Sequence, residues 1–125
     1  MKLSILALTV ALGLGACDAY AAGHSSAPAI EANGILTNAD GMSLYTFDPD
    51  TATTSACNGG CAKSWPPLAA GEGAHDAGDF TVITRDDGTT QWAYQGQPLY
   101  LWINDRKPGD TTGDGVGGKW HLARP

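Results

Sequence analysis

Two cysteines four residues apart are the side chains of this chain with the clearest capacity for chemistry. Cys57 and Cys61 enclose Asn-Gly-Gly, and the two glycines let the backbone turn tightly enough for a disulfide. So short a ring would add about 2 kcal/mol of stability by the loop-entropy argument. Reduced, the same pair could bind Cu(I) through its thiolates, with His121 as a distant ligand. An oxidised pair cannot ligate, however, so we expect a disulfide, no bound metal and no cofactor.

Aromatic and acidic residues recur in two motifs at an offset of 55. The recurring residues are Tyr45, Phe47, Asp50 and Trp65 in the first copy and Tyr100, Trp102, Asp105 and Trp120 in the second. Strand alternation places the two aromatics of each motif on one face, where large rings supply much core energy. An aspartate just beyond a strand commonly accepts backbone N–H bonds. We predict structural roles for these residues; the alternative is an aromatic platform for a flat or apolar ligand.

No set of nucleophile, base and acid can be recognised in the sequence. The chain lacks Gly-x-Ser-x-Gly, His-Glu-x-x-His and a phosphate-binding glycine loop, and its three histidines are scattered. Residues 110–115 have oxygen-bearing side chains at alternate positions, as calcium loops do, but His121 stands where a glutamate would be expected. The sequence therefore predicts a protein that is not an enzyme.

Short apolar segments separated by turn signals must position these residues. Residues 34–37, 42–47, 80–84, 90–94, 98–103 and 119–122 have the composition of strands. Asp-Gly pairs at 40–41 and 87–88 mark tight turns. We predict a small all-β meander or sandwich-like domain over 34–125, with little helix outside the signal peptide. Its two pseudo-equivalent repeats should span about 34–70 and 80–125, related by an approximate two-fold, with long loops at 48–62 and 104–118.

The first sixteen residues have the pattern of a bacterial export signal. A short basic start precedes an apolar run at 3–12 that is too short for a settled membrane span. Residues 14–17, Leu-Gly-Ala-Cys, resemble a lipobox, which would remove residues 1–16 and attach a lipid to Cys17. The alternative is ordinary cleavage near Ala21, which would give a soluble periplasmic or secreted protein.

Composition separates the signal from the domain. Residues 17–33 are rich in Ala, Ser, Gly and Pro, which predicts a flexible tether. Without residues 1–16 the chain has six basic and thirteen acidic residues, a net charge of −7. An acidic surface repels nucleic acid and anionic lipid headgroups. We therefore expect no nucleic-acid partner.

The two motifs, with the Cys-x-x-x-Cys-x-x-x-Trp-Pro-Pro-Leu segment between them, resemble one bacterial family. It is the family of secreted-repeat lipoproteins with a Tyr-x-(Phe/Trp/Tyr)-x-x-Asp motif, and the match covers about residues 36–125. The resemblance implies an exported, often lipid-anchored domain of unknown function, with some members loosely associated with alkane catabolism. Asp18 resembles a signal that retains lipoproteins at the inner membrane.

Together these observations favour a lipid-anchored module of the cell envelope or periplasm that binds an envelope protein or a small ligand. We expect it to act as a monomer and without catalysis. Two alternatives stay open: a copper or redox-related periplasmic protein that uses Cys57 and Cys61, and an accessory protein linked to alkane catabolism.

Overall fold

The computed structural model describes residues 27–125. The signal peptide, Cys17 and the tether up to residue 26 lie outside the described residues. The elements, in order, are β1 (Ile30–Ala32), β2 (Ile35–Thr37), β3 (Tyr45–Phe47), α1 (Gly60–Ser64), β4 (Phe80–Thr84), β5 (Thr90–Tyr94), β6 (Gln97–Pro98), the 3-10 turn η2 (Val116–Gly118) and β7 (Trp120–Leu122). None of the described helices is long and apolar enough to cross a membrane.

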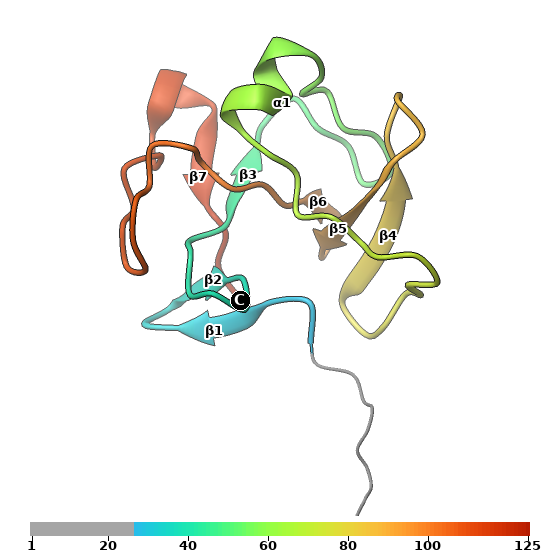
Figure 1. Ribbon diagram of the computed structural model, residues 1–125, viewed down its shortest axis with the longest axis horizontal. Helices are drawn as coiled ribbons and strands as arrows, with labels where there is room; N and C mark the ends of the chain where they lie inside the picture. Colours follow the sequence, from blue (N-terminus) through green and yellow to red (C-terminus); the bar gives the residue numbers. More distant parts are fainter. Residues whose placement is uncertain (1–26) are drawn as a thin grey trace, which may run out of the picture.

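Three small antiparallel sheets make up the domain and confirm the all-β prediction. They pair β1 with β2, β3 with β7, and β4 with β5 and β6. The β1–β2 hairpin lies at one end of the molecule and α1 at the other (Figure 1). The C-terminus returns to the hairpin, where Arg124 Nη1 donates to the Gly34 carbonyl at 3.4 Å.

The first strand of the β1–β2 hairpin lies in the segment 17–33 that composition predicts as tether, and the second lies in the predicted strand 34–37. Asn33 and Gly34 have φ values of 56° and 84°, the two positive angles that a two-residue hairpin turn of type I′ requires. Ala29, just before β1, is buried in the core. The ordered chain therefore begins before residue 34, because an Asn-Gly turn pairs β1 with a strand that was predicted alone.

The turns at the two Asp-Gly pairs form as the sequence predicts. Gly41 and Gly88 have φ values of 85° and 88°. The strand predicted over 98–103 is shorter in the structure: β6 ends at Pro98, and Tyr100 makes isolated bridges to Tyr45 and Pro67. Tyr100 thus pairs with residues of the first repeat and does not extend the β4–β5–β6 sheet.

Equivalent hydrogen bonds relate the two halves. The Tyr45 N–H donates to the Tyr100 carbonyl at 2.8 Å, and the Tyr100 N–H donates to the Tyr45 carbonyl at 2.9 Å. Asp48 N to Lys119 O, at 2.9 Å, has its counterpart at an offset of 55 in Ile103 N to Ser64 O, at 3.1 Å. An approximate two-fold axis therefore passes between Tyr45 and Tyr100.

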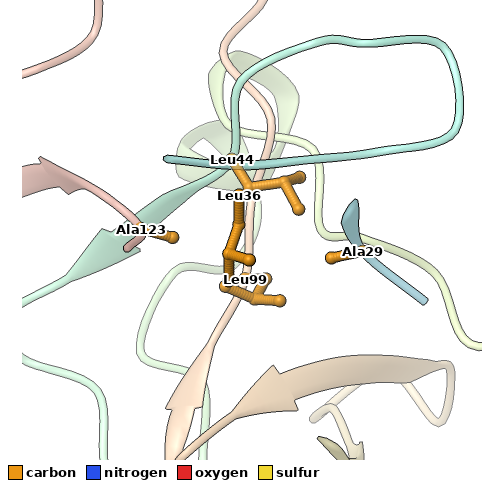
Figure 2. Packing of buried hydrophobic residues seen from close by; sticks show 5 residues of the cluster. All are labelled: Ala29, Leu36, Leu44, Leu99 and Ala123. Atoms are coloured by element: carbon orange, nitrogen blue, oxygen red, sulfur yellow. The ribbon is translucent and has the colours of Figure 1, made fainter. Parts of the chain in front are cut away.

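Two apolar clusters lie on this frame. Figure 2 shows the first, in which Leu36, Leu44 and Leu99 pack together between Ala29 and Ala123. Leu44 and Leu99 are themselves 55 residues apart and wholly buried, so both halves contribute to this core. The second cluster is aromatic and contains the repeated motifs.

Candidate functional site

Each tyrosine of the repeated motif bonds to the aspartate of the other repeat. The Tyr45 hydroxyl donates to Asp105 Oδ2 at 2.7 Å, and the Tyr100 hydroxyl donates to Asp50 Oδ2 at 2.6 Å. Tyr45 and Tyr100 are fully buried. We call these two contacts the reciprocal Tyr–Asp pairs, since neither motif is complete within its own half.

The second oxygen of each aspartate binds the long loop that follows it. Asp50 Oδ1 accepts from the Ala56 N–H at 2.7 Å. Asp105 Oδ1 accepts from both the N–H and the hydroxyl of Thr112, at 2.9 and 2.7 Å. Each carboxylate therefore joins its own loop to the tyrosine of the other half.

Burial raises the pKa of both tyrosines. Desolvation, followed by the hydrogen bond to Asp50, raises the pKa of Tyr100 to about 12. Desolvation and the Asp105 contact likewise raise the pKa of Tyr45. Burial also raises the pKa of Asp50, opposed by the Tyr100 hydroxyl and by the charge of Arg85. Both phenols are hence protonated hydrogen-bond donors at neutral pH.

Four stacked rings lie beside the tyrosines. This aromatic stack consists, in order, of Phe47, Trp120, Trp65 and Trp102. The central Trp65–Trp120 contact has its ring centroids 3.8 Å apart and its planes within 2° of parallel. The outer contacts measure 4.1 Å at Phe47 and 3.9 Å at Trp102.

The tyrosines meet the stack edge-on, again symmetrically. Tyr45 contacts Trp65 at a centroid distance of 5.4 Å, and Tyr100 contacts Trp120 at 5.1 Å. Trp65 and Trp120 are buried, whereas Phe47 and Trp102 at the two ends are half-buried. The repeated motif thus forms one shared aromatic core with an end in each repeat.

A buried arginine distinguishes the first loop from the second. Arg85 Nη1 donates to Ser55 Oγ at 2.9 Å and to Gln91 Oε1 at 2.8 Å, and its Nη2 donates to the Cys57 carbonyl at 2.6 Å. Ser55 Oγ also lies 2.6 Å from the Tyr100 hydroxyl. Since the Tyr100 hydrogen is directed at Asp50, Ser55 donates this bond. The guanidinium thereby connects the loop to the Tyr100–Asp50 pair.

Cys57 and Cys61 form the predicted disulfide, with Cα atoms 5.1 Å apart. Cys57 is fully buried in the aromatic cluster. The disulfide leaves neither residue as a thiolate. His121, the third metal candidate, has Nε2 3.0 Å from Asp48 Oδ1 in an exposed pair. In residues 27–125 no three His, Cys, Asp or Glu side chains gather as a metal would require.

The second loop is fixed by local polar contacts and close packing. Asp110 accepts from the N–H groups of Arg106 and Lys107 and from Lys107 Nζ, which lowers the pKa of this carboxyl. The Gly113 N–H donates to the Tyr45 hydroxyl at 3.1 Å. A Cβ at Gly113 would lie 2.9 Å from ring atoms of Trp65 and Tyr45. Asp110, the first residue of the segment 110–115 that resembles a calcium loop, thus closes a local turn.

The described cavities lie away from the motif. One, about 470 Å³, is lined mainly by Ala and Gly of residues 69–74 and by the β4–β5 turn. His75 lines another, about 350 Å³, with Asp76 and Trp92. Asp76 Oδ1 accepts from the Val82 N–H at 2.9 Å, so this carboxylate fixes the loop to β4. Neither cavity contains a residue of the Tyr–Asp pairs.

Several residues of the site were not predicted from the sequence: Ser55, Arg85, Gln91, Thr112 and Gly113. Arg85 begins an Asp-Asp-Gly turn, where an arginine is ordinarily exposed. Its one distinctive signal is position, since it directly follows the strongly β-branched segment 80–84. The polar partners that surround it come from segments far apart in the chain.

Comparison with known families agrees with the geometry. A family model described as a secreted repeat of unknown function matches residues 29–69 and 81–124, one repeat in each span. No match is found among curated proteins or among solved structures. The first span begins at Ala29, which agrees with the placement of β1 and Ala29 in the domain. Two matched spans that cover most of the chain, each with one copy of the motif, show that the protein belongs to this family of secreted repeats.

Proposed function

We propose that the protein is a lipid-anchored domain of the bacterial cell envelope that acts as a rigid, non-enzymatic binding module. The lipid would be carried by Cys17, and residues 18–26 would connect it to the domain. The family supports export; lipidation and binding are the steps that this proposal adds.

One observation carries the binding role: both long loops are fixed by the reciprocal Tyr–Asp pairs. Both oxygens of Asp50 and both of Asp105 accept hydrogen bonds from within the fold. Loops that are already ordered lose little conformational entropy when they bind a partner. The motif carboxylates therefore serve to present the surface of these loops.

The two ends of the aromatic stack present different surfaces. At the Phe47 end, Asp48 and His121 form an exposed polar pair. The two-fold-equivalent position of Asp48 is Ile103, whose side chain is 54% exposed next to half-buried Trp102. Because both ends share one scaffold, this exchange of charge for apolar surface is not required by the fold. We assign recognition of an apolar or aromatic group to the Trp102–Ile103 end.

The copper alternative depends on reduction of the cysteine pair. The disulfide removes both thiolates, and His121 is engaged with Asp48. Copper or redox chemistry would thus need a reductant to act first, which the binding role does not.

Site-specific crosslinking in intact cells tests the proposal. A photoreactive amino acid at position 103 should give a discrete crosslinked adduct, whereas the same group at position 48 serves as the two-fold-matched control and should give none. Adducts of equal yield at both positions, or none at 103, would contradict recognition at this end.

Labelling with a fatty-acid analogue tests the anchor separately. The wild type should incorporate the label and a Cys17→Ser variant should not. Metal analysis of protein purified without reductant should find no stoichiometric copper; stoichiometric copper together with free thiols would replace the binding role with the copper alternative.

A further inference from the structure

The aromatic stack joins the protein surface to two buried phenols through rings in van der Waals contact. Trp102 is half-buried at one end, and its ring lies 3.9 Å from that of Trp65. The ring centroids of Trp65 and Trp120 lie 3.8 Å apart, and both residues are only 5% exposed. Electron exchange between π systems weakens steeply with separation, so parallel rings in contact are strongly coupled.

Each end point of this path has a base for a phenolic proton. Tyrosine loses its proton when it loses an electron, so its oxidation inside a protein needs an acceptor close to the hydroxyl. Asp50 Oδ2 lies 2.6 Å from the Tyr100 hydroxyl, and Asp105 Oδ2 lies 2.7 Å from that of Tyr45. Both phenols contact the stack at their ring edges.

We propose that the aromatic stack is a one-electron relay that carries oxidising equivalents from Trp102 to Tyr100 and Tyr45. This role uses the same Trp102 end as the binding function proposed above but does not rest on it. A one-electron oxidant in solution takes an electron from Trp102 and is itself reduced. Trp65 then gives an electron to the oxidised Trp102, and Trp120 gives one to the oxidised Trp65. The oxidised site thereby moves from Trp102 into the core.

The path ends when a tyrosine is oxidised. Tyr100 gives one electron to the oxidised tryptophan ring and its phenolic proton to Asp50 Oδ2. The products are a neutral tyrosyl radical, a protonated Asp50 and a restored tryptophan. Return of one electron from a reductant, with return of the proton from Asp50, regenerates the starting state. Tyr45 and Asp105 offer the same step in the other half.

Divergence between the repeats gives the relay a direction. The position equivalent to Trp102 is Phe47, whose ring stacks on Trp120 at 4.1 Å. Phenylalanine is far harder to oxidise than tryptophan. Phe47 therefore closes the stack at one end, while Trp102 opens it to oxidants at the other. Phe47 stacks on Trp120 as Trp102 stacks on Trp65, so a phenylalanine at position 102 would be enough for packing.

Flash photolysis of the full domain with a photogenerated ruthenium(III) tris(bipyridine) oxidant tests the relay. In the wild type, a transient tryptophanyl absorption should give way to tyrosyl absorption, and freeze-quenched samples should show the tyrosyl signal by electron paramagnetic resonance. Trp102→Phe copies the natural arrangement at Phe47 and should remove most of the tyrosyl signal. A tyrosyl yield unchanged in Trp102→Phe would overturn the proposal.

Matched variants separate the relay from direct oxidation of other residues. Trp92→Phe and Tyr94→Phe remove oxidisable rings outside the stack and should leave the tyrosyl yield unchanged. Phe47→Trp should add a second entry point and raise the yield. Tyr45→Phe with Tyr100→Phe should leave a long-lived tryptophanyl radical. A tyrosyl signal that survives this double variant would place the radical elsewhere and refute the relay; thermal melts check that each variant is folded.

Discussion

The loops of the two repeats, 48–62 and 104–118, each follow a copy of the repeated motif and are then fixed by different means. In the first loop a disulfide closes a short local ring, and the buried Arg85 connects the loop to a segment about 30 residues further along the chain. In the second, Thr112 returns to Asp105 and Gly113 packs directly under two aromatic rings. The features that the loops share, the reciprocal Tyr–Asp pairs and the Trp65–Trp120 contact, therefore define the scaffold. The features that differ are local solutions for holding a loop.

Loss of Arg85 should destabilise the protein most, because only the first of the two loops depends on a buried cation. Arg85→Met would leave Ser55, Gln91 and the Cys57 carbonyl without their donor, and breaking such a buried charged network costs about 3–5 kcal/mol. Urea unfolding followed by tryptophan fluorescence measures the loss. Arg124→Met, at an exposed site, is the control and should change stability by less than about 0.5 kcal/mol. Equal effects at both sites would refute a special role for Arg85.

A side chain at Gly113 should damage the second loop in a way that has no counterpart in the first. Gly113→Ala places a Cβ 2.9 Å from ring atoms of Trp65 and Tyr45, which already pack edge-on against each other. We expect a destabilisation of about 2–3 kcal/mol from this overpacking. Gly71→Ala, where nothing lies within 4 Å of the added Cβ, should be nearly neutral in the same unfolding assay. A tolerated Gly113→Ala would show that the loop can move away from the rings.

Removal of the disulfide should weaken the first loop by a smaller amount. Cys57→Ser with Cys61→Ser, or reduction of the wild type, should cost about 2 kcal/mol, since the closed ring is short. The second repeat has Thr112 and Val116 at the equivalent positions. The domain should therefore remain folded at room temperature, which near-ultraviolet circular dichroism would establish. Complete unfolding on reduction would contradict the view that the disulfide is only one of several contacts.

The exposed Asp48–His121 pair should matter least. Surface ion pairs contribute about 0–1 kcal/mol, so Asp48→Asn should barely change the midpoint of unfolding. Ile103→Asp, which puts a charge at the two-fold-equivalent position, should likewise spare stability. A large loss from either variant would mean that the ends of the stack are part of the folding core.

The architecture of this chain could be predicted from the sequence because it is expressed in local signals. The Asp-Gly turns at Gly41 and Gly88 and the β-branched segment that became β4 each depend on nearby residues, and the repeat at an offset of 55 can be read by comparing the sequence with itself. The disulfide was also predictable, since the sequence has three cysteines and the lipobox assigns Cys17 to the lipid. Cys57 and Cys61 are then the remaining pair. The β1–β2 hairpin was missed although Asn33-Gly34 is a strong turn signal, because the surrounding composition indicated a linker.

The contacts of the site could not be predicted, since they join distant segments. Tyr45 bonds to Asp105 of the other repeat, 60 residues away, and not to the aspartate of its own motif. Arg85 meets Ser55 across 30 residues. Spacing in a single sequence gives the side-chain types at such a site, but the two-fold arrangement of the halves decides which of them meet.

Double-mutant cycles on the reciprocal Tyr–Asp pairs test whether each motif is completed by the aspartate of the other repeat. Tyr45→Phe combined with Asp105→Ala, and Tyr100→Phe combined with Asp50→Ala, should each show a coupling energy of about 1–3 kcal/mol in urea unfolding. Tyr45→Phe combined with Asp50→Ala joins residues of one motif and should be additive to within about 0.5 kcal/mol. Coupling between Tyr45 and Asp50, with additivity for Tyr45 with Asp105 and for Tyr100 with Asp50, would show that the motifs are not completed across the repeats.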